Sequence, residues 1–262
     1  MVFDELTRPD TDVGRYGGTL DAAVVLLHAH PDDETLSTGG LMARLAADGV
    51  RVVLITGTRG ERGEVVPGPL KRLEGSPGLA ETRVAELDAA MVELGVGDHR
   101  FLGAAGARAA GLPPRRYSDS GMQWESDGVA IAAEDAPADA LSRAQLDEII
   151  ADVLSVTDEV HPQVLVSYDA NGGYGHPDHV RMHDAAVAVA ARIGVPVYTI
   201  VPRAVDAEIG DHVVPLGEFR PAKRRALAAH RTQLTVDGDE IVLSGGQRSA
   251  LNDSEVFRRW VP

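Results

Sequence analysis

Short runs rich in Val, Leu and Ile alternate along this chain with longer segments of helical periodicity, and this alternation constrains the fold most strongly. The five candidate strands are AAVVLLH, RVVLITG, HRFLG, QVLVSYD and VPVYTIV, at residues 22–28, 51–57, 99–103, 163–169 and 195–201. Because their apolar character is nearly continuous, we expect the sheet to be covered on both faces. The pattern predicts an α/β fold that is Rossmann-like, with a mostly parallel sheet and helices on both faces.

The segments between these runs space their apolar residues three and four apart, which is typical of helices. They are LMARLAADG, LAETRVAELDAAMVELG, SRAQLDEIIADVLSVTDEV and PDHVRMHDAAVAVAARIG, beginning at residues 41, 79, 142 and 177. Near the C-terminus, LTVDGDEIVLS indicates a hairpin around Asp237 and Gly238. No boundary divides the sequence, so we expect residues 1–262 to form a single domain.

Two stretches interrupt the alternation, at residues 65–78 and at about 104–140, and the second is rich in Gly, Ala and Pro. Long connections of this kind in α/β domains are usually functional lids or disordered linkers, and both alternatives stay open. The sequence GTRGERGE at 57–64 is rich in glycine, but it lacks the spacing of the phosphate-binding loops. We expect it to line a site.

Charge and composition exclude several classes of partner. The chain has 25 Lys and Arg against 40 Asp and Glu, and its formal net charge of −15 would repel nucleic acids and anionic membranes. No apolar run approaches the roughly 20 residues that cross a bilayer, and the first twenty residues do not resemble a signal peptide. We therefore expect a cytoplasmic protein. With no cysteine, any metal must be held by His, Asp or Glu.

Acids and imidazoles crowd the end of the first candidate strand, in the sequence HAHPDDE. If residues 31–33 are helical, with Pro31 at the first helical position, His30 and Asp33 are three apart and can converge on one cation. Asp32 would then point elsewhere and be a candidate general base. The structural alternative is helix capping, because acids favour the first turn of any helix.

The same arrangement returns after the fourth candidate strand, where QVLVSYDANGGYGHPDHV places a Gly-rich turn before His176, Pro177, Asp178 and His179. One or both histidines could face the first cluster across a crevice between two strand ends. Two histidines and one carboxylate would leave a fourth position open for water. As an alternative, His30 and Asp32 with the distant His179 match the facial-triad spacing of non-haem iron oxygenases, although these usually have antiparallel β-folds.

The sequences AHPDDE (29–34) and GGYGHPDH (172–179) together resemble the PIG-L/LmbE-like superfamily of metal-dependent N-deacetylases, which have a Rossmann-like fold. Within that superfamily, HAHPDDETLSTGG, ETRVAEL, YSDSGM and SYDANGGYGHPDHV are most similar to the mycothiol-pathway enzymes that deacetylate N-acetylglucosaminyl-inositol. The resemblance extends over most of the chain. Residues 104–140 and the C-terminal part differ from those enzymes.

The resemblance implies a role for nine residues. Three would be zinc ligands: His30, Asp33 and His179. Asp32 would be the general base, His176 the general acid or an oxyanion partner, and Tyr174 an oxyanion donor, with Asp178 orienting His176. Arg83 and Asp119 would hold substrate hydroxyls, although Arg83 could instead form a salt bridge with Glu81 or Glu86.

The resemblance also implies a zinc-dependent amidohydrolase that acts on the acetamide of a small N-acetyl amino sugar, with ferrous iron as an alternative metal. A mycothiol S-conjugate amidase and an N-deacetylase of an antibiotic pathway are the alternatives within this class. A non-catalytic metal- or sugar-binding module and an iron oxygenase are the alternatives outside it. The sequence leaves open whether the chain forms a homo-oligomer.

Overall fold

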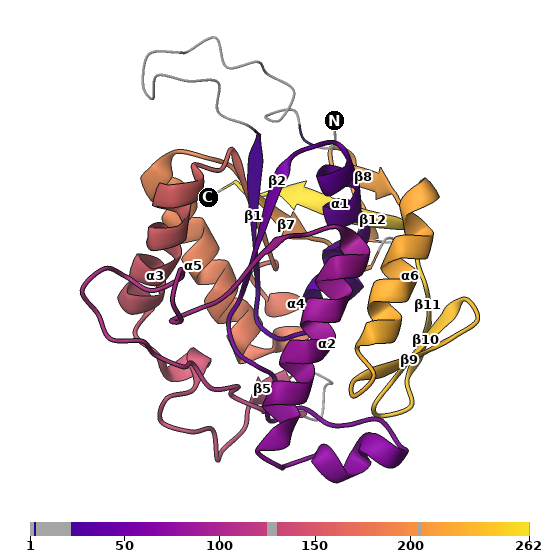
Figure 1. Ribbon diagram of the computed structural model, residues 1–262. Coiled ribbons are helices and arrows are strands. Elements are labelled where there is room, and N and C mark those ends of the chain that lie inside the picture. Colours follow the sequence, from indigo (N-terminus) through magenta and orange to yellow (C-terminus); the bar gives the residue numbers. More distant parts are fainter. Residues whose placement is uncertain (1–2, 4–21, 125–129, 204–205, 262) are drawn as a thin grey trace.

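A seven-stranded sheet with the strand order β3-β2-β1-β6-β7-β12-β8 lies at the centre of the molecule (Figure 1). The computed structural model describes residues 3, 22–124, 130–203 and 206–261. Five adjacent strands are parallel, and they are β3 (Asp98–Phe101), β2 (Arg51–Thr56), β1 (Ala23–His28), β6 (Val164–Ser167) and β7 (Val197–Ile200). Each overlaps one of the candidate strands, so the predicted α/β fold with a mostly parallel sheet is confirmed.

The strand order reverses between β1 and β6. From β1 the chain passes through α1 (Asp33–Ala47) to β2 and through α2 (Gly78–Leu94) to β3. It then crosses back through α3 (Leu146–Val160) to β6, on the other side of β1, and continues through α5 (Pro177–Ile193) to β7. In open α/β sheets, ligands bind outside the carboxyl ends of the strands at such a reversal.

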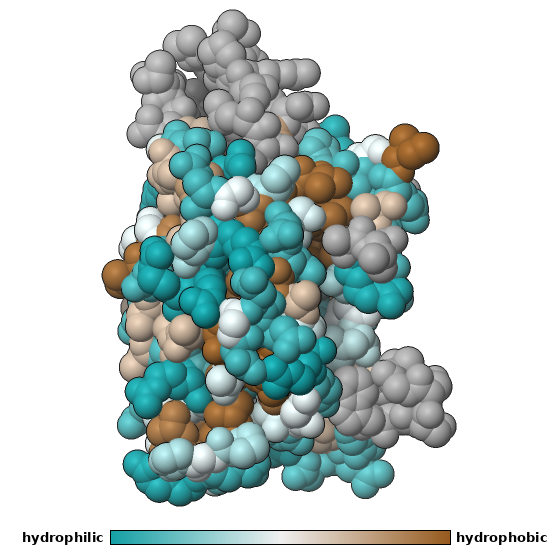
Figure 2. All heavy atoms as spheres, turned by 90° about the vertical axis from the view of Figure 1, so that its right-hand side faces the viewer, coloured by the Kyte–Doolittle hydropathy of each residue, from teal (hydrophilic) through white to brown (hydrophobic). Residues whose placement is uncertain are grey.

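Helices cover both faces of the sheet, as predicted. Helices α1, α2 and α6 (Arg220–Ala229) pack together on one side, and α3 packs against α5 on the other (Figure 1). Figure 2 shows the face on the right of Figure 1, where hydrophilic residues cover most of the surface and hydrophobic residues form small groups between them. No helix in the described ranges is long and apolar enough to span a membrane.

The C-terminal part of the chain differs from the prediction. Strand β12 (Ser254–Arg259) is inserted antiparallel between β7 and β8 (His212–Pro215). The sequence did not indicate β8 or β12. Their mixture of polar and apolar residues does not resemble the continuous apolar runs of the parallel strands. The predicted hairpin forms from β9 (Leu234–Asp237) and β10 (Glu240–Leu243), but Asp237 pairs with Glu240. The turn of the hairpin therefore lies one residue later than expected. Strand β11 (Arg248–Ala250) pairs with β10 and extends the hairpin to a three-stranded sheet.

The two long connections contain only short elements. The first includes the 3₁₀ helix η2 (Pro69–Leu73), and the second includes the short antiparallel strands β4 (Met122–Trp124) and β5 (Ala130–Ala132). Residues 125–129 of the second connection lie outside the described residues.

A buried carboxylate fastens the second connection to α3. The fully buried Asp152 accepts a hydrogen bond from the Tyr117 hydroxyl at 2.8 Å, and its Oδ2 lies 3.0 Å from Arg108 Nη1. Tyr117 lies just before Asp119 and Ser120 in the sequence, so its contact with Asp152 helps to position these two residues relative to the central sheet.

One buried ion pair ties α1, α6 and β12 together. Lys223 Nζ lies 2.7 Å from Glu255 Oε1, and both side chains are 3% exposed. The Glu255 carboxylate also accepts hydrogen bonds from the amides of Gly40 (2.8 Å) and Leu41 (2.7 Å) in α1. The ammonium group of Lys223 donates in turn to the Leu36 carbonyl at 2.7 Å.

We expect Lys223→Met to lower the free energy of unfolding by about 3–5 kcal/mol, because it leaves a buried carboxylate without its cation. Urea denaturation measures the change. Arg225→Met is the matched control on the same helix, because the pair between Arg225 and Glu93 is 58% and 38% exposed and should contribute at most about 1 kcal/mol. Equal losses in the two variants would contradict the assignment.

Candidate active site

The turn after β1 brings His30 and Asp33 together in a way that the sequence did not indicate. Helix α1 begins at Asp33, so the expectation that Pro31 occupies the first helical position is wrong. The side chain of Asp33 folds back instead. Its Oδ2 accepts a hydrogen bond from the His30 amide at 3.0 Å and lies 3.1 Å from His30 Nδ1.

The turn after β6 is built around Gly172. In this turn α4 (Gly172–Gly175) leads to His176, and Pro177 is the first residue of α5, as expected for proline. His179 Nδ1 lies 3.1 Å from the Gly172 carbonyl, to which it donates. Gly172 has φ +64°, and a Cβ there would come within 2.9 Å of His179 Cβ. Only glycine therefore allows this contact, which leaves Nε2 of His179 directed into the site.

The three residues expected to hold metal converge on one point. The distances are 3.1 Å between His30 Nδ1 and Asp33 Oδ2, 3.2 Å between Asp33 Oδ2 and His179 Nε2, and 3.3 Å between the two histidine nitrogens. Tetrahedral zinc with bonds of about 2.0–2.2 Å separates its ligands by about 3.3–3.5 Å. The donor set and its spacing therefore fit a zinc ion.

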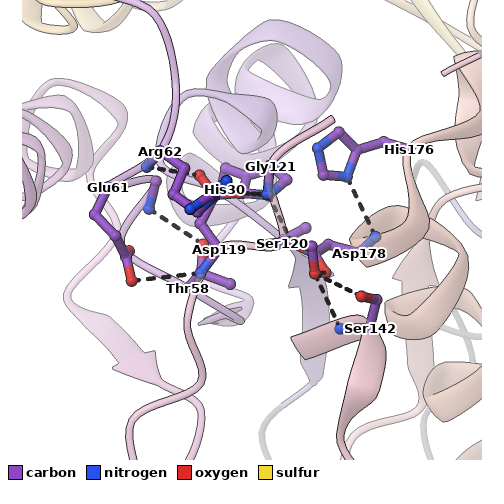
Figure 3. A network of polar contacts seen from close by, with 12 residues as sticks. His30, Thr58, Glu61, Arg62, Asp119, Ser120, Gly121, Ser142, His176 and Asp178 are labelled. Carbon is purple, nitrogen blue, oxygen red and sulfur yellow. Dashed lines mark hydrogen bonds and ion pairs between the residues drawn. The ribbon is translucent and has the colours of Figure 1, made fainter. Parts of the chain in front are cut away.

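Two further carboxylates face the opposite nitrogen of His30. Its Nε2 lies 3.2 Å from Asp178 Oδ2 and 3.7 Å from Asp119 Oδ1. The Asp178 carboxylate is held by the amide of Ser120 at 3.0 Å and by the Ser120 hydroxyl (Figure 3). Carboxylates in this position orient a metal-binding histidine and increase its basicity.

The contacts of Asp178 differ from the expected ones. We expected its carboxylate to orient His176, but the carboxylate contacts His30 and Ser120. The backbone amide of Asp178 makes the contact with His176, by donating to Nδ1 at 3.2 Å (Figure 3). Since Nδ1 is the acceptor, neutral His176 carries its proton on Nε2.

The surroundings of His176 favour its neutral form. Burial, together with the positive charges of His30 and His179, lowers its pKa to about 2. The nearby carboxylate of Asp178 acts in the opposite direction but has the smaller effect on this pKa. The ring of Tyr174, a residue that is 45% exposed, lies with its centroid 6.1 Å from that of His176.

The pKa values of the adjacent residues Asp32 and Asp33 are shifted in opposite directions. Although burial opposes ionisation, His179 and His30 hold the pKa of Asp33 well below its ordinary value. Burial and the negative charge of Asp33 raise the pKa of Asp32 to about 8. Among the described residues, none donates a hydrogen bond to the Asp32 carboxylate, which remains available as a base. Its backbone has φ 109° and ψ −33°, a conformation that costs a non-glycine residue on the order of 1–3 kcal/mol.

Sequence reasoning missed a residue that holds the ligand set in place. The hydroxyl of Tyr168 accepts a hydrogen bond from the Ala29 amide at 2.8 Å and donates to Asp33 Oδ2 at 2.7 Å. Its ring stacks on that of His179, with 4.1 Å between centroids. The sequence signal that could have identified Tyr168 is its position, as a polar aromatic residue at a strand end beside a Gly-rich turn.

Arg83 and Asp119 lie on either side of the 57–64 loop. The buried Arg83 guanidinium donates to the carbonyls of Gly60 and Glu64, the latter at 2.8 Å, and forms no ion pair with Glu81 or Glu86. Asp119 accepts from the amide of Arg62 at 3.1 Å and from that of Gly121 at 2.8 Å. Both residues therefore shape the loop, and their contact with substrate hydroxyls stays a prediction.

Comparison with known proteins identifies the family to which the chain is similar. The sequence model of the PIG-L family, described as GlcNAc-PI de-N-acetylase, matches residues 25–190. A Nocardioides protein named 1D-myo-inositol 2-acetamido-2-deoxy-alpha-D-glucopyranoside deacetylase is 36% identical, over 92% of each chain. A protein of the same name from Kineococcus radiotolerans is 43% identical, over 90% of this chain and 76% of its own.

Solved structures support the fold. A teicoplanin-pathway deacetylase matches with a TM-score of 0.58 and 24% identity, over 80% of this chain and 84% of its own. The N,N'-diacetylchitobiose deacetylase of Pyrococcus horikoshii matches with a TM-score of 0.56 and 20% identity, over 86% of this chain and 73% of its own.

Family membership sets aside both the iron oxygenase and the non-catalytic binding module. The motifs HPDD and HPDH lie within the matched residues and form the site at the reversal of strand order. The chain therefore belongs to the PIG-L family, the GlcNAc-PI de-N-acetylases, and is a hydrolase of the N-deacetylase class.

Proposed function

We propose that this chain removes the acetyl group of N-acetylglucosaminyl-inositol, using a zinc ion held by His30, Asp33 and His179. The observation that carries the proposal is the triangle of their donor atoms, with edges of 3.1, 3.2 and 3.3 Å. The names of the actinobacterial relatives support the choice of substrate. The cytoplasmic location expected from the sequence stays a prediction.

The charge of the site supports a bound cation. Three carboxylates, those of Asp33, Asp119 and Asp178, lie within 4 Å of the ring nitrogens of His30. Although burial opposes its protonation, Asp119, Asp178 and Asp33 raise the pKa of His30 well above its ordinary value. A zinc ion at this position would compensate the negative charge, and it would supply a Lewis acid that acidifies water and polarises a carbonyl group.

Asp32 performs the proton transfers in the proposed reaction. In its ionised form, Asp32 is a stronger base than an ordinary carboxylate because its pKa is raised, and in that form it accepts a proton from water as the oxygen attacks the acetyl carbon. The carbon–nitrogen bond then breaks, and Asp32 returns the proton to the departing amine. The products are acetate and the free amino sugar. We assign the acid step to Asp32 rather than to His176, because Asp32 already holds the proton taken from water and the surroundings of His176 favour its neutral form.

His176 and Tyr174 stabilise the developing oxyanion. Nε2 of neutral His176 bears a hydrogen, because Nδ1 accepts from the Asp178 amide. Burial and the carboxylates of Asp33 and Asp32 raise the pKa of Tyr174, so its hydroxyl keeps its proton. Two fixed donors of this kind act on charge that appears only in the transition state.

The zinc-loaded chain should release a primary amine from N-acetylglucosaminyl-inositol, and Asp32→Ala should lower kcat by about 10²–10⁴-fold because the general base is lost. Fluorescent labelling of the released amine measures both, with chelated protein as the control. Near-normal turnover by Asp32→Ala would contradict its role. No release by folded, metal-loaded wild type would reject the inositol conjugate, and mycothiol S-conjugates and N-acylated glycopeptides would be assayed next.

The zinc content of variants should distinguish the proposed metal ligands from the residues beside them. His30→Ala, Asp33→Ala and His179→Ala should each lose bound zinc, whereas Asp32→Ala should retain it. Ser120→Ala, which removes a donor to Asp178, should weaken zinc affinity by about 10–100-fold. Elemental analysis and competition with a chelator measure these effects. Equal metal loss in Asp32→Ala and the three ligand variants would defeat the division of roles.

Tyr174→Phe should lower kcat by about 10²–10³-fold while zinc content stays normal, because one oxyanion donor is removed without touching the ligand set. Steady-state kinetics on the inositol conjugate measure the loss. Since Tyr174 is 45% exposed, the melting temperature should hardly change. An unchanged kcat would remove Tyr174 from the mechanism.

A further inference from the structure

The position of the Asp32 carboxylate depends on its backbone. The side chain of Asp33 is fixed by the His30 amide and the Tyr168 hydroxyl, whereas no described residue donates a hydrogen bond to the Asp32 carboxylate. In the described part of the chain, Asp32 and His161 are the two non-glycine residues with positive φ. Something must therefore hold the peptide of Asp32 in this unfavourable conformation.

Glu34 supplies that restraint. Its Oε2 accepts a hydrogen bond from the Asp32 amide at 2.9 Å, which ties the turn to the first residues of α1. The Glu34 side chain is fully buried. Its other oxygen, Oε1, lies 3.1 Å from Nε2 of His230 and accepts a hydrogen bond from the Thr35 hydroxyl.

His230 fixes Glu34 from a distant part of the sequence. It follows directly after α6, which packs beside α1 (Figure 1), and it is fully buried. The side-chain nitrogen Nε2 of Gln233 lies 3.4 Å from Nδ1 of His230. Residues 25–190 match the family model, so His230 lies outside the matched segment. A chain of contacts thus runs from His230 through Glu34 to the amide of Asp32.

We propose that Glu34 and His230 are positioning residues, which hold the Asp32 peptide so that its carboxylate faces the metal site. This inference rests on the proposed role of Asp32 as the base. The competing explanation is that the pair only joins α1 to α6, as the buried pair of Lys223 and Glu255 does. That second pair connects the same two helices without touching the site, so it provides a matched control.

Three variants test the proposal. Glu34→Gln places an amide NH₂ group against either the Asp32 amide or His230, both of which are donors. His230→Leu removes the imidazole that contacts Glu34 and leaves the Thr35 hydroxyl as the donor to Oε1, whereas His230→Gln keeps a side-chain N–H that can donate to it. We expect kcat to fall by about 10–100-fold in Glu34→Gln and His230→Leu, because a small displacement of a catalytic group has effects of this size. KM and zinc content should stay unchanged, and His230→Gln should recover most of the activity.

Lys223→Met distinguishes positioning from stability. Below its unfolding temperature it should keep kcat within about twofold of wild type, even though it is destabilised. Amide hydrogen exchange at Asp32, measured by NMR, gives a readout that does not depend on turnover. Exchange should become faster in Glu34→Gln and His230→Leu, and it should stay unchanged in Lys223→Met.

A double-mutant cycle identifies the residue through which Glu34 acts. When Asp32 is already alanine, adding Glu34→Gln should lower the residual rate by less than about twofold, because the group being positioned is absent. Additive effects would overturn the inference, as would normal kcat and normal Asp32 exchange in His230→Leu. Near-normal turnover by Asp32→Ala would instead refute the proposed role of Asp32, so the two failures are distinguishable.

Discussion

The reversal of strand order between β1 and β6 is the constraint on which the site depends. Parallel strands end at the same edge of a sheet, and the chain leaves neighbouring strands in opposite directions only at a reversal. The turns after β1 and β6 therefore open towards each other, and each ends in a His-Pro-Asp sequence. Two turns that are about 145 residues apart in sequence thus supply one triangle of donor atoms.

Concentrated negative charge is the second organising feature. Each carboxylate of the site has a different environment. Asp33 faces two histidines, Asp178 accepts hydrogen bonds from Ser120, and Asp119 accepts hydrogen bonds from two backbone amides. Asp32 alone is left without such donors among the described residues. Four chemically identical groups therefore differ in their hydrogen bonds rather than in their residue type, and the proposed mechanism gives them different roles on this basis.

The sequence predicted the parallel strands and the convergence of His30, Asp33 and His179, because apolar continuity and repeated ligand spacing are local signals. It did not predict β8 and β12, whose pairing is decided by tertiary contacts rather than by apolar runs. The conformation of Asp32, the contact of Asp178 with His30, and the arrival of His230 beside Glu34 depend on which elements meet in space. A pattern within one segment carries no information about these contacts.

The insertion of β12 between β7 and β8 also determines the order in which the molecule can be completed during synthesis. Among the described strands, β8 pairs only with β12, so it has no described partner in the sheet until residues 254–259 have been synthesised. Glu255 of that same strand caps two amides of α1, the helix that begins at the metal-facing Asp33. The earliest and latest parts of the described sheet are therefore joined in one step, and the nascent chain reaches its finished site only when that last strand has docked.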